Sequence, residues 1–131
     1  MKKIIPNITV DSCSEALEFY KQVFGGKVEN IQTSEGKEMF KGYEGKIIHS
    51  EFIINDECIM YFTDIFGPKA SGSNISLMLQ MDSEDEISRI YLKLKEKGRV
   101  TFELQKTFWG SYHAVVTDTF GVTWSLDYSG K

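Results

Sequence analysis

The stretch Val10-Asp-Ser-Cys-Ser-Glu-Ala-Leu-Glu-Phe-Tyr-Lys-Gln-Val-Phe-Gly-Gly26 decides the fold, because it runs from a strand end into a helix that carries its own start and stop signals. Ser12 is a good N-cap, and Glu15 follows three residues later, as in a capping box. Apolar residues then recur at helical spacing, at Ala16, Leu17, Tyr20, Val23 and Phe24. Gly25 and Gly26 offer the left-handed conformation that ends many helices. The stretch therefore predicts a helix over residues 12–24.

The same pattern returns in the second half, in Met81-Asp-Ser-Glu-Asp-Glu-Ile-Ser-Arg-Ile-Tyr-Leu-Lys-Leu-Lys-Glu-Lys-Gly98. The offset between the two stretches is constant, and it matches Asp11 with Asp82, Ser12 with Ser83, Glu15 with Glu86, and Tyr20 with Tyr91. The chain is therefore interpreted as two copies of one unit. The matching places of the two tyrosines indicate a structural role between helix and sheet.

Each copy has the pattern of a β-α-β-β-β module. In the first module, residues 1–65, we expect strands over residues 3–10, 27–34, 47–55 and 58–63, with a loop over residues 35–46. In the second, residues 74–131, we expect strands over residues 74–81, 99–106, 111–117 and 122–128 and a helix over residues 83–97. Residues 66–73 form the expected connector. One half leaves a sheet face uncovered, so the two are expected to pair. The fold class is then α+β, a single domain of residues 1–131 whose curved mixed sheet carries the helices on its outer face.

Composition excludes several classes of protein. The chain has 131 residues and a formal net charge of −4, which argues against nucleic-acid binding. It has no apolar run that could span a bilayer and no signal segment, so we expect no membrane contact. Two cysteines, Cys13 and Cys58, give neither a disulfide framework nor metal-ligand spacing, and we expect both to be inert. A reduced cytoplasmic location follows as the default.

Strand alternation predicts a polar face opposite the helices. We expect Ile75, Leu77, Leu79 and Met81 to pack under the helices, and Asn74, Ser76, Met78 and Gln80 to face away. In the last strand Trp124 and Leu126 should pack, whereas Thr123, Ser125 and Asp127 should face away. A curved sheet with a polar inner surface is typical of a small-molecule cleft.

Seven residues are candidates for lining that cleft: His49, Glu51, Tyr61, Ser76, Gln80, Trp109 and Ser125. His49 and Glu51 stand two apart on one strand and so share a face. They fit a base with its orienting carboxylate or part of a metal site, and equally a surface pair without function. Trp109 precedes a glycine at a strand end, where it either floors a pocket or simply packs. His113 is a weaker candidate, and Asp118 is expected to cap its own turn.

Two motifs now resemble a known family, the vicinal oxygen chelate superfamily, which includes glyoxalase I, extradiol dioxygenases and bleomycin-resistance proteins. Glu15-Ala-Leu-Glu-Phe-Tyr-Lys-Gln-Val-Phe-Gly-Gly26 is similar to the first helix of that family. Thr107-Phe-Trp-Gly-Ser-Tyr-His-Ala-Val-Val-Thr-Asp-Thr-Phe-Gly-Val-Thr-Trp-Ser-Leu126 resembles the C-terminal signature of its PhnB-like branch, also labelled demethylubiquinone methyltransferase-like. The resemblance covers essentially the whole chain.

The chain departs from the metal-dependent members at the positions that the resemblance implies for ligands. Those members use two His or Gln and two Glu, whereas the matching positions here are Ile5, Tyr61, Asn74 or Ser76, and Ser125. These side chains are poor ligands for a divalent cation. Thr119 also stands where the family commonly has proline. A methyltransferase gains no support, because no strand opens onto a glycine-rich loop before a helix.

Three functions stay open, and the residues establish no particular reaction or even that the protein is an enzyme. The first is a metal-free, cofactor-free small-molecule-binding protein that uses the polar face. The second is a divalent-metal lyase or dioxygenase that uses His49 and Glu51. The third is an antibiotic-sequestering protein of the resistance type. The resemblance also implies a homodimer, since members often complete a cleft by pairing modules across two chains.

Overall fold

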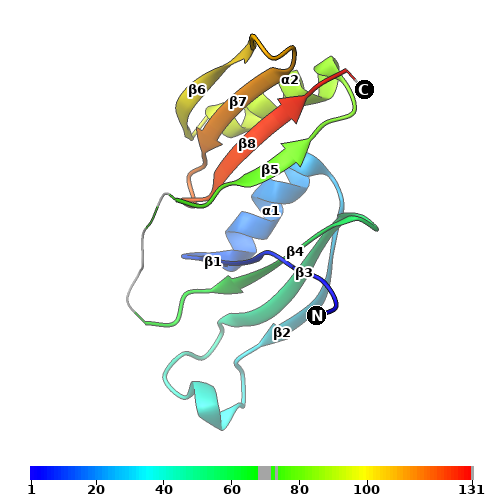
Figure 1. The fold of residues 1–131 in the computed structure, drawn as a ribbon. Coiled ribbons are helices and arrows are strands. Elements are labelled where there is room, and N and C mark those ends of the chain that lie inside the picture. The colour runs from blue at the N-terminus through cyan, green and yellow to red at the C-terminus, as the bar shows by residue number, and fades with distance from the viewer. Residues whose placement is uncertain (68–71, 73, 131) are drawn as a thin grey trace. The chain divides into compact units, whose positions relative to one another are not determined.

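The computed structural model describes residues 1–67, 72 and 74–130, and it divides into two compact units, Met1–Lys69 and Ala70–Lys131 (Figure 1). Each unit contains one β-α-β-β-β module. The division falls inside the expected connector, residues 66–73, but residues 68–71 and 73 lie outside the described part of the chain, so the connector stays a prediction. Neither of the two described α-helices has the length and apolarity needed to cross a bilayer.

The first module is a four-stranded sheet with one helix on one face. Its elements are β1 (Asn7–Val10), α1 (Cys13–Phe24), β2 (Lys27–Thr33), a 3-10 turn η1 (Glu38–Phe40), β3 (Ile47–Asn55) and β4 (Cys58–Asp64). The strand order is β1-β4-β3-β2, with β1 parallel to β4 and the other neighbours antiparallel.

The second module repeats this topology. Its elements are β5 (Leu77–Gln80), α2 (Glu84–Lys95), β6 (Arg99–Lys106), β7 (Tyr112–Thr117) and β8 (Thr123–Tyr128). The order is β5-β8-β7-β6, again with the first and last strands parallel. Two mixed sheets with two helices confirm the α+β class, and the hydrogen bonds divide the eight strands equally between the sheets.

Aromatic rings fill the core of the first module. The helix α1 packs on β1, β3 and β4. The fully buried Tyr20 stacks on Phe62 at 5.0 Å between ring centroids, with Phe52 edge-on beside them. Gly25 caps the helix, and Gly26 follows it at φ +84°, where a Cβ would lie 2.5 Å from the carbonyl oxygen of Ile53. The close approach of α1's exit to β3 therefore requires glycine.

The start of α1 corrects one expectation. The side chain of Ser12 makes no cap, so the predicted capping box with Glu15 is wrong. Instead the buried carboxylate of Asp64 accepts the backbone N–H of Cys13 at 2.8 Å and that of Ile47 at 2.7 Å. A charged side chain from the end of β4 thus satisfies the helix start and the start of β3 together.

The helix α2 begins differently, with a local cap. Ser83 Oγ accepts the backbone N–H of Glu86 at 3.1 Å, and Glu86 Oε1 accepts the N–H of Asp82 at 2.9 Å. This reciprocal pair resembles a capping box. The second module therefore uses the signal that the sequence places at both helix starts.

The core of the second module lies between α2 and the strands β6, β7 and β8. Its buried side chains are Ile87, Ile90, Tyr91, Leu94, Ala114, Val116, Trp124 and Leu126. Asp118 caps its own turn, as expected, by accepting the N–H groups of Phe120 and Val122 through Oδ1. Its Oδ2 also accepts Trp124 Nε1–H at 2.8 Å, which fixes the large indole.

The helix residues that face the sheets are mostly buried: Leu17, Ile90 and Leu94 are buried, whereas Phe24 is only half-buried. Most strand residues follow the expected alternation. The expectation that Ile75 packs under the helix is wrong, because its side chain is 76% exposed. The strand β5 begins only at Leu77, so the alternation does not extend back to Ile75.

Candidate functional site

Except for Trp109, which lies in a turn, the candidate residues lie on or beside the sheet faces opposite the helices, called here the helix-free faces. In β3, Ser50 and Phe52 are buried, and the alternation places His49 and Glu51 on the other face. Tyr61 stands directly opposite Glu51 in the β3–β4 register and lies on the same face. The structure therefore brings three of the seven sequence candidates together in the first module.

These three side chains make direct contacts. His49 Nε2 and Glu51 Oε2 are 2.8 Å apart, and the two side chains are 28% and 21% exposed. The rings of His49 and Tyr61 meet edge to face, with 4.8 Å between their centroids. The arrangement is a carboxylate, an imidazole and a phenol in contact and within reach of solvent.

A bulge in β2 adds a fourth residue. The β2–β3 register shifts between Glu29 and Gln32, and Asn30 lies there with φ +51°, a conformation that few residues other than glycine adopt. The hydrogen bond from His49, followed by one from Asn30, lowers the pKa of Glu51 below its usual value, and the charge of Lys3 adds a smaller effect. Glu51 is therefore held as a carboxylate whose donors come from two strands.

The second module holds the other four sequence candidates. Ser76 Oγ and Ser125 Oγ are 3.0 Å apart, and Ser125 is only 7% exposed. Gln80 is exposed at the end of β5. Trp109 lies in the turn between β6 and β7 and is 56% exposed.

His113, the weaker candidate from the sequence, lies in the second module. It lies on the helix-free face of β7, because Ala114 and Val116 are fully buried on the other face. Asp127 is its cross-strand neighbour in β8, with Nδ1 and Oδ1 3.5 Å apart. The alternation rule had already placed Asp127 on this face, but the register that pairs the two residues could not be predicted.

The two cysteines are free. Cys13 is completely buried at the start of α1, and desolvation raises the pKa of its thiol from 9.0 to about 11. A thiol that stays protonated is a poor nucleophile, which supports the expectation that it is inert. Cys58 lies exposed at the β3–β4 hairpin.

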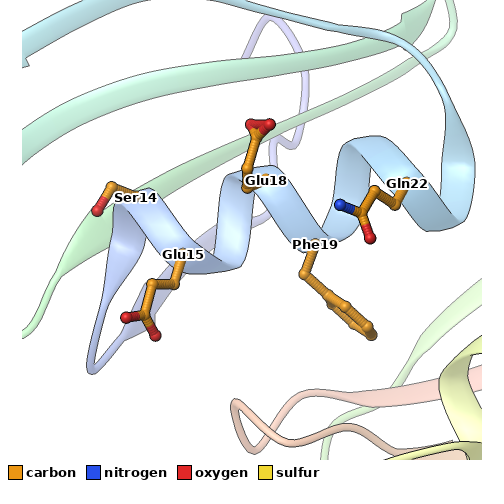
Figure 2. Close-up of a pocket in the computed structure, with 5 residues that line it drawn as sticks. All are labelled: Ser14, Glu15, Glu18, Phe19 and Gln22. Atoms are coloured by element: carbon orange, nitrogen blue, oxygen red, sulfur yellow. The ribbon is translucent and has the colours of Figure 1, made fainter.

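Surface hollows also occur away from these residues. One lies along α1 and is lined by Ser14, Glu15, Glu18, Phe19 and Gln22; Figure 2 shows the Phe19 ring projecting from the helix beside Glu15, with Glu18 on another side. A second hollow borders the β3–β4 hairpin, and a third borders the loop around η1. The hollow on α1 has lining residues from one helix only, so it lacks the convergent groups of a ligand site.

Two mixed four-stranded sheets, each built from a β-α-β-β-β module with polar residues on the helix-free face, define a class of small two-module α+β proteins. The chain belongs to the Glyoxalase/Bleomycin resistance protein/Dioxygenase superfamily, whose family model matches residues 5–126. The resemblance stated from the two sequence motifs is thereby confirmed.

Individual relatives agree with this assignment. Protein YjdN of Escherichia coli (strain K12) is 26% identical over 128 residues, which cover 88% of this chain and 87% of that protein. The crystal structure of PA1353 from Pseudomonas aeruginosa matches with a TM-score of 0.87 and 26% identity over 98% of both chains. A Bacillus cereus PhnB protein, described as a putative 3-demethylubiquinone-9 3-methyltransferase, shares the fold with a TM-score of 0.80 and 23% identity, over 97% of this chain and 99% of that one.

The superfamily implies a divalent metal in some of its members, and the donor set tests that implication. Among the described residues, no three His, Cys, Asp or Glu side chains gather as a metal site would require. His49 and Glu51 supply two donors, and they are already bonded to each other. The residues present therefore do not fit a divalent cation, which usually takes three or four protein ligands.

Proposed function

We propose that the protein binds a small organic molecule on the helix-free face of its first sheet, without a metal or cofactor. The observation that carries the proposal is the bonded set Asn30–Glu51–His49 beside Tyr61. Asn30 holds an uncommon backbone conformation at a bulge, and such positions concentrate at functional sites. The Asn30 amide and the His49 imidazole both hydrogen-bond to the Glu51 carboxylate, so the three side chains are oriented before any ligand binds.

The chemistry of the set indicates the kind of ligand. In the neutral imidazole whose Nε2–H donates to Glu51, Nδ1 is a hydrogen-bond acceptor. The aromatic ring of Tyr61 lies next to this imidazole. An acceptor next to aromatic rings suits a small aromatic molecule that carries a hydroxyl donor.

Binding is tested with 4-nitrophenol, a coloured aromatic hydroxyl compound. We expect a saturable change in its absorbance on titration with the protein, and a loss of at least about tenfold in affinity in His49→Ala, because the acceptor of the ligand's hydrogen bond is removed. Glu51→Gln should also weaken binding. Glu57→Gln, which removes an equivalent carboxylate from the hairpin turn of the same module, is the matched control and should bind as the parent protein does. Equal affinity in all variants would refute the proposal.

Two alternatives use the same face and are separated by measurement. Sequestration of an antibiotic would return the ligand unchanged, whereas an enzyme would convert it, so the bound ligand is recovered and analysed. A metal enzyme would carry one metal per chain. We expect elemental analysis to find no stoichiometric Zn, Ni, Mn or Fe, and chelators to leave the unfolding temperature unchanged.

A homodimer in a reducing, cytoplasmic setting completes the proposal. The edge strands, β1 and β2 in one sheet and β5 and β6 in the other, leave backbone groups without a strand partner in the described chain, and such edges favour pairing with another chain. Sedimentation at micromolar concentration should give twice the 15.0 kDa mass of one chain. A single species at the mass of one chain would contradict this part of the proposal.

A further inference from the structure

The second sheet contains a polar atom that the fold leaves unsatisfied. His113 Nδ1 is buried and has no hydrogen-bond partner, although a carboxylate stands 3.5 Å away. Buried polar atoms are almost always paired, because leaving one unpaired costs about 1–3 kcal/mol. An exception of this kind, beside a carboxylate, calls for a functional explanation.

The carboxylate is itself held in place. Ser111 Oγ donates to Asp127 Oδ1 at 3.1 Å, and Ser111 is nearly fully buried where the turn between β6 and β7 ends. Thr107 closes the same turn by donating to the carbonyl oxygen of Ser111 at 3.0 Å. Asp127 thus faces the imidazole from a fixed position, as the orienting carboxylate of a general base does.

Two aromatic side chains also contact the imidazole. Phe102 of β6 and Trp109 of the turn meet the ring of His113 edge to face, with centroids 5.5 Å and 5.9 Å away. Trp109 is 56% exposed and Phe108 is 98% exposed, so the turn presents flat apolar surface next to the imidazole. Nε2 lies at the tip of the His113 side chain, away from the atom that faces Asp127.

We propose that His113 is a general base at a second site, with Asp127 as its positioning residue and Trp109 as the surface on which a planar aromatic substrate with an acidic proton binds. The substrate proton moves to Nε2, and the Nδ1–H of the resulting imidazolium points to the Asp127 carboxylate, which stays ionised. The 3.5 Å contact shortens as the positive charge forms, as catalytic hydrogen bonds often do only in the complex. The proposal does not rest on the 4-nitrophenol site, because every residue in it belongs to the other module.

The test uses 5-nitrobenzisoxazole, a planar aromatic compound that reacts with a base in one step. The base removes the ring C–H proton, the electron pair forms the nitrile, the N–O bond breaks, and a coloured phenolate leaves. We expect the protein to accelerate this elimination over buffer, and His113→Gln to lose about a hundredfold of kcat/KM, at the low end of what general bases contribute.

Two further variants separate catalysis from structure. Asp127→Asn removes the charge that stabilises the imidazolium, so the midpoint of the pH profile should move to lower pH, an effect that a merely structural role would not produce. Trp109→Ala should raise KM with little change in kcat, and Leu92→Ala, which truncates an exposed apolar residue of α2, is its control and should leave both constants unchanged. Circular dichroism confirms that each variant is folded. No acceleration by the parent protein, or a rate that His113→Gln leaves intact, would overturn the proposal.

Discussion

The two histidines occupy the same place in the two modules but have differently placed partners. Each stands opposite a glutamine of an edge strand and beside a register shift, His49 opposite Gln32 and His113 opposite Gln105. His49 bonds to a carboxylate on its own strand, whereas His113 faces one on the next strand. A partner two residues away is visible in the sequence, and a cross-strand partner depends on a register that only the fold supplies. The same difference separates the two helix starts, one capped locally and one by a distant carboxylate.

The largest expected effect tests what the modules share. Leu17→Ala in α1 and Leu94→Ala in α2 should each lower the free energy of unfolding by about 2–5 kcal/mol, because both side chains are buried against a sheet. Urea denaturation followed by circular dichroism measures the loss. A change below about 0.5 kcal/mol, typical of surface positions, would contradict the helix placement in that module.

The next effect tests how the helix starts differ. Asp64→Ala leaves two buried N–H groups without an acceptor and should cost about 2–4 kcal/mol, whereas Ser83→Ala removes one local cap and should cost about 1 kcal/mol. The same denaturation experiment compares the two variants. Equal losses would show that the distant carboxylate contributes no more than an ordinary cap.

Thiol chemistry sharpens the comparison within the first module. At mildly alkaline pH a thiol reagent should modify Cys58 quickly and leave Cys13 unmodified, because burial keeps Cys13 protonated. Mass spectrometry after timed quenching gives the number of labels per chain. Cys58→Ser should then abolish labelling of the folded protein, and rapid labelling of that variant would contradict the burial of Cys13.

The smallest expected effect concerns acid. The pKa of Glu51 is lowered in the folded state, so its contribution to stability is complete above the ordinary carboxyl value of 4.5 and is lost as the pH falls through the lowered value. When the pH is lowered from neutral to below this range, the Glu51→Gln variant should therefore lose less stability than the parent protein does. The midpoint of urea unfolding at each pH is the measurement, and an identical loss in both proteins would contradict the prediction.

Much of the fold could be predicted because its signals are local. The bounds of β3 and β6 match the expected ranges, and the alternation in β8 assigns Trp124 and Leu126 to the core correctly. The capping box failed because Asp64, 51 residues along the chain, takes the N–H of Cys13. The pairing of His113 with Asp127 could not be predicted for the same physical reason, since sheet register brings the two together.

The site could be predicted only in part. His49 and Glu51 were found because residues two apart on a strand share a face, and their contact at 2.8 Å fits that reasoning. The role of Asn30 could not be predicted, since the residue type alone indicates neither the bulge in β2 nor the positive φ. The expected involvement of Ser76, Gln80 and Ser125 in binding stays a prediction.

The parallel pairing of β1 with β4, and of β5 with β8, has a consequence for how the chain folds during synthesis. Each sheet places its first strand beside its last, so neither sheet can be completed until the end of its module has been made. Pairing of segments far apart in sequence slows folding, because a long loop must close first. On a ribosome the first module can complete its sheet while β5 to β8 are still being made. Until β4 or β8 has been synthesised, the core of its module stays exposed to solvent, because β1 or β5 has no strand to pair with.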